Sequence, residues 1–409
     1  MTEFTIRPVT AEEYPAFVTA FMEGFSDDVP SDTFAETFRN TLPPERTLAA
    51  FEGEDIVGTL GGYDLELTVP GGTVPMEGTT VVTVFPTHRR MGLLRAMMSD
   101  HLDNAIANGY PIAGLWASES DIYGRFGYGV ATYAYSGTMD GSRVVLRDEI
   151  SVERVLRIRG EHAIDILPAV FDRVRVGTPG MFARDATWWI YDILRDEDWM
   201  KRGRTSKRYV VHDGPDGPDG YAIYRQKSGE SDDGHADGTV RVMEVIAGTP
   251  VARASLWSFL TQVDGCPNVR VWNMAIDDPL SMMVVEPRRM RMTGTFDALW
   301  VRILNVPAAL ESRTYELDGS VIFAVVDPFR VDTEGTYRLT VDGGSGTCES
   351  VDGVPDVELD IDVLGALYLG AGRAHGYAAA NRIRGSRADI DALERMFRTS
   401  RQPWCNQVF

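Results

Sequence analysis

The stretch PTHRRMGLLRAMM, residues 86–98, brings together residue types that bind anions. Arg89 and Arg90 supply charged donors that suit phosphate geometry, and Gly92 lets the backbone approach an anion without a Cβ in the way. A helix N-terminus directly after them would add unpaired N–H groups and the positive end of the helix dipole. The joint therefore predicts a pyrophosphate cradle, and the alternative is a solvated basic turn. A Walker loop is excluded because no Gly-Lys-Ser/Thr is present, and a single glycine excludes a dinucleotide fingerprint.

The elements around this turn alternate between strands and helices. Apolar residues recur at helical spacing after it, which predicts a helix to about Asn108, ended by Gly109. The pattern predicts antiparallel strands over residues 47–85, separated by Gly- and Pro-marked turns, and a buried strand over residues 111–117. Thr10 and Glu13 form a capping box for a helix near the start.

The chain is too long for one typical domain, and the order of elements predicts three. We place them at residues 1–150, 151–299 and 300–409. The second unit repeats the order of the first, with a helix near Leu167–Val174 whose first turn suits Pro168. It contains no counterpart of the arginine turn; the nearest sequence, PRRMRMTG, lacks the strand before it and the helical pattern after it.

Composition sets limits on partners and on location. The net charge of −20 disfavours nucleic acid and anionic membranes and favours cations. The first residues do not read as a signal peptide, and no run of about 18 apolar residues is present. Three separated cysteines and six scattered histidines indicate neither a disulfide framework nor a metal site. We expect a cytoplasmic protein without a metal.

Several stretches resemble the Eis (enhanced intracellular survival) aminoglycoside N-acetyltransferases of the GNAT superfamily. They are PTHRRMGLLRAMM, GYPIAGLWASE, IYGRFGYG, LWVRILNVPAALE, DVLGALYLGA and AAANRI, and the resemblance extends over the full chain. The superfamily pattern Arg/Gln-x-x-Gly-x-Gly/Ala maps onto Arg89, Gly92 and Leu94, where Leu94 departs from the usual small residue. The resemblance implies an α+β fold with two tandem GNAT-type domains and a sterol-carrier-like C-terminal domain. Only the first domain would be active.

The resemblance also implies acetyl-CoA as co-substrate, with a set of residues in the first domain that would bind it. Tyr123 matches the tyrosine that protonates the leaving thiolate, and a phenol with a pKa of about 10 suits that task. The rival is Tyr128, and the alternative for Tyr123 is a core tyrosine. The expected cofactor-binding residues are Val82, Thr83, Val84, Arg89, Arg90, Gly92, Leu93, Leu94 and Ser118.

For the amine substrate, the resemblance places Phe25, Asp27 and Phe38 at the pocket, with Asp27 holding ammonium groups and Phe38 forming an aromatic wall. The alternative is an acidic loop that caps a helix. The family often has an acidic residue before its terminal phenylalanine, and here that residue is Val408. The family's general base is the carboxylate of the terminal phenylalanine, here Phe409. The apolar and aromatic residues 402–409 indicate that this end of the chain is held down.

The expected reaction is acetylation of aminoglycoside amines, at several positions per molecule. One alternative is acetylation of protein lysine ε-amines or polyamines, and another is a non-catalytic lipid carrier. The resemblance further implies a homo-oligomer, a hexamer built as a trimer of dimers. Partners would be cationic small-molecule amines, with neither nucleic acid nor membrane.

Overall fold

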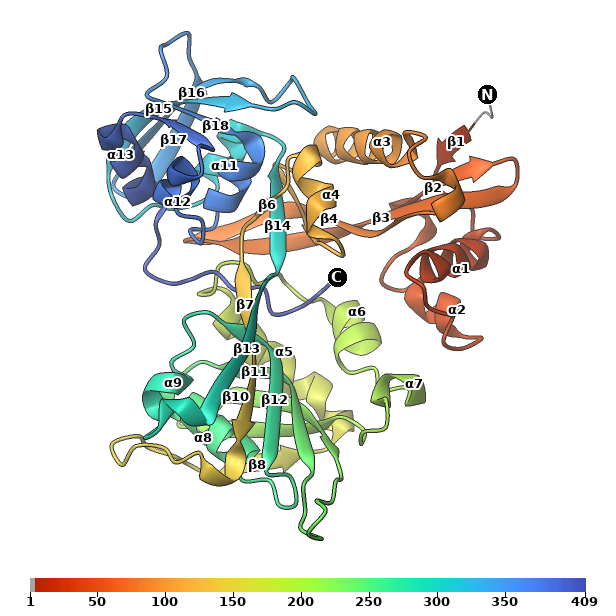
Figure 1. The fold of residues 1–409 in the computed structure, drawn as a ribbon, viewed down its shortest axis with the longest axis vertical. Helices are drawn as coiled ribbons and strands as arrows, with labels where there is room; N and C mark the ends of the chain where they lie inside the picture. The colour runs from red at the N-terminus through yellow and green to blue at the C-terminus, as the bar shows by residue number, and fades with distance from the viewer. Residues whose placement is uncertain (1–3) are drawn as a thin grey trace. The chain divides into compact units, whose positions relative to one another are not determined.

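The computed structural model describes residues 4–409, which form two compact units (Figure 1). The first unit contains residues 4–132, 298–400 and 407–409. The second contains residues 133–297 and 401–406. The chain therefore leaves and re-enters each unit.

A seven-stranded sheet forms the centre of the first unit. The first four strands are antiparallel, the fourth and fifth are parallel, and the last pairings are antiparallel again. In spatial order the strands are β1 (Phe4–Arg7), β2 (Thr47–Glu52), β3 (Asp55–Val69), β4 (Gly72–Val84), β5 (Ile112–Trp116), β14 (Leu299–Ile303) and β6 (Gly129–Val130).

Helices cover both faces of this sheet (Figure 1). Helix α3 (Leu93–Ala107) connects β4 to the parallel β5 and buries Met97, Met98 and Leu102 against one face. On the other side lie α1 (Tyr14–Gly24) and the short α2 (Phe34–Phe38). The capping box forms before α1: the Thr10 N–H donates to Glu13 Oε2 at 2.9 Å, and the Glu13 N–H donates to Thr10 Oγ1 at 3.3 Å. That prediction is confirmed.

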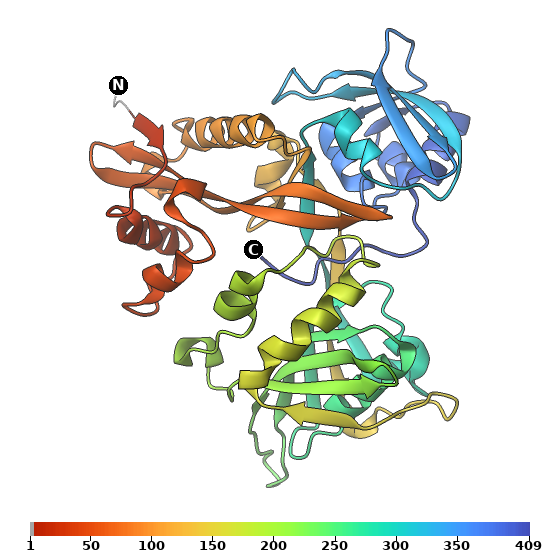
Figure 2. The same ribbon diagram turned by 180° about the vertical axis from the view of Figure 1, so that it is seen from behind.

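The second unit has a second seven-stranded sheet with the same order of parallel and antiparallel pairings. Its strands are β8 (Val155–Ile158), β9 (Arg208–Gly214), β10 (Gly217–Lys227), β11 (Thr239–Ala247), β12 (Asn268–Ala275), β7 (Tyr133–Asp140) and β13 (Met290–Asp297). Helix α8 (Pro250–Thr261) connects the parallel β11 and β12, as α3 does in the first sheet. Helix α5 (Ala163–Arg175) covers the opposite face (Figure 2), and the remaining helices are α6 (Ala186–Trp188), α7 (Asp198–Lys201) and α9 (Leu280–Met283).

Two strands pair in a different sheet from the one that the expected boundaries at residues 150 and 299 would give them. Strand β7 (Tyr133–Asp140) precedes the first boundary but pairs in the second sheet, between β12 and β13. Strand β14 (Leu299–Ile303) pairs in the first sheet, between β5 and β6, and every one of its residues is buried. Apolar alternation predicts a strand, but its partners are far away in the sequence, so the pattern does not identify the sheet.

Helix α5 begins earlier than expected. It starts at Ala163, so Pro168 lies inside the helix and not in its first turn. The expectation for Pro168 was wrong because tertiary packing of Ala163 and Leu167 extends the helix in front of the proline.

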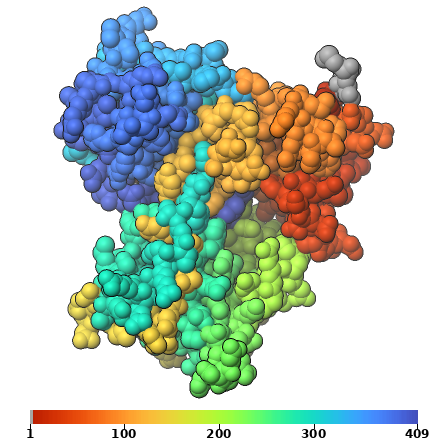
Figure 3. Space-filling model, in the orientation of Figure 1, coloured from red at the N-terminus to blue at the C-terminus, as the bar shows by residue number. Residues whose placement is uncertain are grey.

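Residues 306–400 form a third body within the first unit, coloured blue in Figure 3. Its sheet has the order β17-β16-β15-β18-β19. These strands are β15 (Gly319–Val326), β16 (Gly335–Asp342), β17 (Ser345–Ser350), β18 (Val357–Asp360) and β19 (Ile383–Gly385), and the helices are α10 (Val306–Glu311), α11 (Ile361–Leu367), α12 (Ala374–Ala379) and α13 (Arg387–Phe397). Within residues 4–409 no helix is long and apolar enough to cross a membrane.

The third body packs closely against the first sheet. A Cβ at Gly129 would lie 1.7 Å from the carbonyl oxygen of Asp362, and a Cβ at Gly365 would lie 2.2 Å from that of Val301. Only glycines permit this approach of α11 to the strands. The buried guanidinium of Arg302 on β14 also pairs with the buried carboxylate of Asp327, which fixes the contact in one arrangement.

Candidate active site

The first sheet opens between its two parallel strands. Strands β4 and β5 pair only at Met76–Gly78 and Ile112–Gly114. Beyond these residues they diverge, and two cavities lie along the divergence. The larger has a volume of about 740 Å³ and is lined by β4, the turn before α3, and residues 118–126. The smaller has a volume of about 340 Å³ and is lined by Thr79–Val82, Trp116–Ser118, Tyr123 and the chain end.

A bulge lies in β4 where the strands diverge. The register with β3 shifts between Thr59 and Gly61, and Val81 has φ +44°. Positive φ is strained for a β-branched residue and needs support from its surroundings. Thr59 provides that support, because its hydroxyl lies 2.7 Å from the Val81 carbonyl oxygen and 2.7 Å from Thr83 Oγ1. The bulge turns the backbone of Val82–Val84 toward the larger cavity, whose wall these residues form.

The arginine turn has the geometry that an anion requires. Arg90 has φ +65° and Gly92 has φ +87°, and Gly92 is the N-terminal cap of α3. A Cβ at Gly92 would meet nothing within 4 Å, so the space over the turn is open and the glycine is needed for its backbone conformation. Successive N–H groups in such a turn at a helix N-terminus bind anions well.

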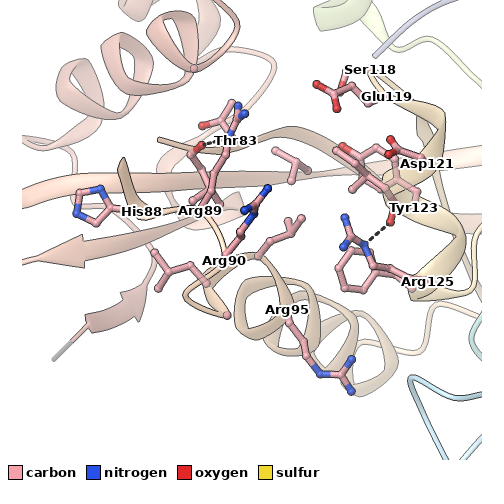
Figure 4. A pocket seen from close by; sticks show the side chains of 18 of the residues that line it. Thr83, His88, Arg89, Arg90, Arg95, Ser118, Glu119, Asp121, Tyr123 and Arg125 are labelled. Atoms are coloured by element: carbon pink, nitrogen blue, oxygen red, sulfur yellow. Dashed lines mark hydrogen bonds between the residues drawn. The ribbon is translucent and has the colours of Figure 1, made fainter. Parts of the chain in front are cut away.

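Basic side chains outnumber acidic ones around the larger cavity (Figure 4). Four arginines line it, namely Arg89, Arg90, Arg95 and Arg125, against Glu119 and Asp121. Arg89 and Arg90 are exposed, and within residues 4–409 neither has a carboxylate partner; the Arg89 side chain donates instead to the Val84 carbonyl oxygen at 3.3 Å. In a chain with net charge −20, this local excess of positive charge indicates a site for an anionic ligand.

Tyr123 lies across the larger cavity from the arginine turn, at the end of the short helix α4 (Ser120–Tyr123) (Figure 4). It lines both cavities and is only 4% exposed. Burial raises the pKa of its phenol, and a hydrogen bond with Ser118 opposes that shift. A phenol kept neutral at the junction of the two cavities can donate a proton to a leaving group there.

Tyr128 occupies a different environment, although it is only five residues further on. It is fully buried and lines neither of these two cavities. Its hydroxyl lies 2.9 Å from Thr79 Oγ1, which in turn lies 2.9 Å from His101 Nε2. Burial lowers the pKa of His101 to about 3, so the imidazole is neutral, and Glu77 and Arg46 complete the network through a 2.7 Å ion pair. This network holds the wall of the smaller cavity at Thr79.

The chain end reaches the smaller cavity. Phe409 lines it, with its ring centroid 6.4 Å from that of Tyr63 and its Cε2 3.2 Å from the position of a Cβ at Gly78. Phe25 lines both cavities and is 46% exposed. The smaller cavity is therefore walled by the aromatic side chains of Phe25, Trp116, Tyr123 and Phe409.

The residues that we selected from the sequence divide into two groups. All nine expected cofactor-binding residues line the larger cavity, and Tyr123, Phe25 and Phe409 line one or both cavities. Asp27 and Phe38 line neither: Asp27 is exposed, and Phe38 stacks on Phe34 at a centroid distance of 5.7 Å. Their roles toward substrate stay predictions. We did not select Thr79, Trp116 or Arg125, although Trp116 lies inside GYPIAGLWASE and Arg125 inside IYGRFGYG, two stretches that carry the resemblance.

The second sheet has a cavity of about 440 Å³ at the equivalent place, but it lacks the arginine turn. The joint between β11 and α8 reads Gly248-Thr249-Pro250, without arginines. The N-terminus of α8 is already satisfied, because the Thr249 hydroxyl accepts from the Ala252 N–H at 3.1 Å and donates to Asp219 Oδ2 at 2.7 Å. Its first-turn arginine, Arg253, is neutralised by Asp278 at 2.6 Å.

Comparison with known proteins assigns the domains. Two models of the acetyltransferase (GNAT) domain match residues 5–131 and 180–303, and a model of the sterol carrier protein domain matches residues 306–406. The architecture expected from the sequence is therefore confirmed: two GNAT domains are followed by a sterol-carrier-like domain.

Full-length relatives carry the same assignment. An uncharacterised N-acetyltransferase of Streptomyces avermitilis is 35% identical and covers 100% of this chain and 99% of its own length. The N-acetyltransferase Eis of Mycobacterium tuberculosis is 33% identical over 93% of both chains. The crystal structure of Eis1 from Mycobacterium abscessus superposes with a TM-score of 0.86 at 28% identity and covers 99% of this chain and 100% of that chain. The chain therefore belongs to the Eis family of GNAT acetyltransferases, and it is an N-acetyltransferase that uses acetyl-CoA as co-substrate.

Proposed function

We propose that this enzyme transfers the acetyl group of acetyl-CoA to amines of aminoglycosides, at several positions per molecule. The observation that carries the proposal is the aromatic smaller cavity, which meets the larger one at Tyr123. Aromatic rings attract ammonium groups, and the chain's net charge of −20 draws polycations to its surface. The carboxylate of Asp27 is exposed and follows Phe25 by two residues, and we propose it as an acceptor for a substrate ammonium group.

Each part of the site has a proposed task in the reaction. The arginine turn and the N-terminus of α3 hold the pyrophosphate of acetyl-CoA, and Val82–Val84 hold its pantetheine arm. A backbone N–H of this strand polarises the thioester carbonyl, which stabilises the oxyanion that forms when the amine attacks. Tyr123 then protonates the leaving thiolate.

The proposed acceptor of the amine proton is the carboxylate of Phe409. An α-carboxyl group has a pKa of about 3.5, which makes it a weak base. Burial raises the pKa of such a group, and a fixed position beside the amine gives a large effective molarity. The place of Phe409 in the smaller cavity supports this assignment.

The test is a thiol-release assay with acetyl-CoA against three acceptors: kanamycin, spermidine and a lysine peptide. The proposal expects kcat/KM for kanamycin to exceed both others by about tenfold or more, and several acetyl groups per kanamycin by mass spectrometry. A preference for the lysine peptide would replace the proposed substrate with protein amines. The purely non-catalytic lipid carrier is set aside, because the relatives are N-acetyltransferases.

We further propose that the enzyme assembles as a homo-hexamer, a trimer of dimers, as the family resemblance implies. Sedimentation at micromolar concentration tests this directly. A single species with the 45.3 kDa mass of the chain would overturn the proposal.

A further inference from the structure

The segment Arg401–Asn406 is bound along its whole length to the second unit. Its backbone and side chains make hydrogen bonds to loops and strands of that unit, at distances of 2.7–3.0 Å. They are Arg401 to the Gly177 carbonyl, the Gln402 N–H to Asp277, the Trp404 N–H to the Pro179 carbonyl, the Trp404 indole N–H to Asn273, the Asn273 amide to the Cys405 carbonyl, and the Asn406 amide to Glu244.

The strand residues that bind this segment lie where the second sheet opens. Strands β11 and β12 pair only at Thr239–Val242 and Asn268–Val271. Glu244 and Asn273 follow these paired residues on the two strands. In the first sheet the equivalent parallel strands pair over a similarly short stretch, and the residues beyond line the two cavities of the active site. The segment therefore occupies the place in the second domain that corresponds to the smaller cavity of the first. Arg401 and Trp404 also line a cavity of about 440 Å³ beside the joint between β11 and α8.

Asn273 is the centre of this interaction. It is 8% exposed, its Oδ1 accepts from the indole of Trp404 at 2.7 Å, and its Nδ2 donates to the Cys405 carbonyl at 3.0 Å. Both polar atoms of one buried amide are thus used on the segment. Trp404 also packs against the apolar cluster under α5, and Cys405 is fully buried.

The last three residues leave the second unit. Gln407–Phe409 belong to the first unit, and Phe409 lines the smaller cavity there. A single peptide bond joins Asn406 to Gln407, so the chain is fixed directly before the residues that reach the active site.

We propose that the diverging strands of the second domain are a permanent binding site for the chain's own segment Arg401–Asn406, and that Asn273 and Trp404 are positioning residues for acetyl transfer. The second domain then holds the segment from which the chain continues through Gln407 and Val408 to Phe409. This inference rests on the proposed function for the role of Phe409, but the binding of the segment is measured independently of it.

The test compares Asn273→Ala and Trp404→Phe with the control Asn268→Ala. Asn268 is on the same strand and its side chain bonds to Asp237 at 2.7 Å, away from the segment. Trp404→Phe keeps most of the ring packing and removes only the indole donor. Displacement of a catalytic group by about 1 Å costs about 100-fold in rate, so Asn273→Ala should lower kcat for kanamycin by about tenfold to 100-fold, with KM for acetyl-CoA within about twofold of wild type.

A second measurement reports the segment itself. Carboxypeptidase should release the terminal residues of Asn273→Ala and Trp404→Phe at least about tenfold faster than those of wild type and Asn268→Ala, while circular dichroism confirms that all four proteins are folded. Equal release rates in all four would overturn the inference, and unfolding of Asn273→Ala leaves Trp404→Phe to decide. Faster release with unchanged kcat would keep the binding site and refute the positioning role. Full activity of a C-terminally extended wild type would refute only the proposed base.

Discussion

In the first domain β4 and β5 diverge after Gly78 and Gly114, and in the second β11 and β12 diverge after Val242 and Val271. The first opening leads to a basic turn with Arg90 and Gly92 at positive φ, and the second leads to a helix whose first turn is already neutralised. The first opening holds two cavities that meet at Tyr123, and in the second opening residues 401–406 bind the strands and line one side of a cavity of about 440 Å³. The same order of strands thus supports either a small-molecule site or a site for the chain itself, because function depends on the residues at the opening and not on the sheet.

Among the changes that test this comparison, loss of the chain end should have the largest effect on the rate of acetyl transfer. Deletion of Phe409, or a C-terminal extension of several residues, is expected to abolish acetyl transfer, because deletion moves the carboxylate by about 3.5 Å and an extension removes it from the cavity. Thiol release gives the rate, and thermal melting shows that the fold survives. An extended protein with wild-type turnover would place the base elsewhere.

Removal of the Tyr123 hydroxyl should have the next largest effect. Tyr123→Phe keeps both substrates bound and loses only the proton donor, so kcat should fall by roughly 100-fold or more with little change in either KM. The matched control is Tyr128→Phe, whose hydroxyl contacts Thr79 and lies outside both cavities. If Tyr128→Phe were inactive and Tyr123→Phe nearly normal, the assignment of the two tyrosines would have to be exchanged.

The arginine turn offers a comparison between the two domains. Replacement of Arg89 and Arg90 by alanine removes charge-assisted hydrogen bonds of roughly 1.5–3 kcal/mol each, so KM for acetyl-CoA should rise by about tenfold or more. The control replaces Arg288 and Arg289, the similar pair in the second domain, where Arg289 already pairs with Glu286 at 2.9 Å. Titration calorimetry with coenzyme A measures the affinity directly. Equal losses in both double variants would mean that charge alone, and not the turn, binds the cofactor.

The smallest expected effect is on the pH dependence of stability, and it comes from His101 in the buried network of the first domain. Its pKa is lowered to about 3 by burial, so the unfolded chain takes up a proton below about pH 6.5 while the folded chain does not. Stability from this group is therefore present above about pH 6.5 and is lost as the pH falls toward 3, by up to about 1.4 kcal/mol per pH unit. A His101→Gln variant removes the imidazole and keeps both partners of the neighbouring Arg46–Glu77 ion pair.

Urea unfolding at pH 7.5 and at pH 5 separates this contribution. Wild type should lose more free energy of unfolding between the two pH values than His101→Gln does, by about 2 kcal/mol, with the variant less dependent on pH. Equal losses of unfolding free energy in the two proteins would show that a group other than His101 lowers the stability at acid pH.

Local sequence was a good guide wherever a few neighbouring residues determine the structure. The Thr10–Glu13 capping box and the helix from Leu93 with Gly109 after it were both predicted, because their hydrogen bonds and backbone angles depend on adjacent residues. The arginine turn and Tyr123 were also visible, as short motifs carried by a family resemblance.

Residues far apart in the sequence were harder to place. Thr79 lies in no stretch that we singled out, and nothing in GYPIAGLWASE gives Trp116 a role; both line the smaller cavity because β4 and β5 diverge beside them. The sequence could not predict that β7 pairs in the second sheet and β14 in the first. The apolar pattern of each strand is compatible with either sheet, because it specifies a buried face and not a partner. The bulge at Val81 depends on the hydroxyl of Thr59, which lies on the neighbouring strand β3, 22 positions earlier in the sequence.

Through the family resemblance, the sequence by itself indicated the fold class and the acetyl-CoA chemistry, which are confirmed, and an active first domain, which stays a prediction. The anion-binding turn and the glycine-rich tyrosine turn that carry this resemblance are local features. It also indicated, from residues 402–409, that the chain end is held. Only the tertiary structure decided what holds it, namely Asn273 and Glu244 on two diverging strands. Hydrogen bonds between residues more than 130 positions apart form only when packing brings them together, and no pattern within either segment encodes the partner.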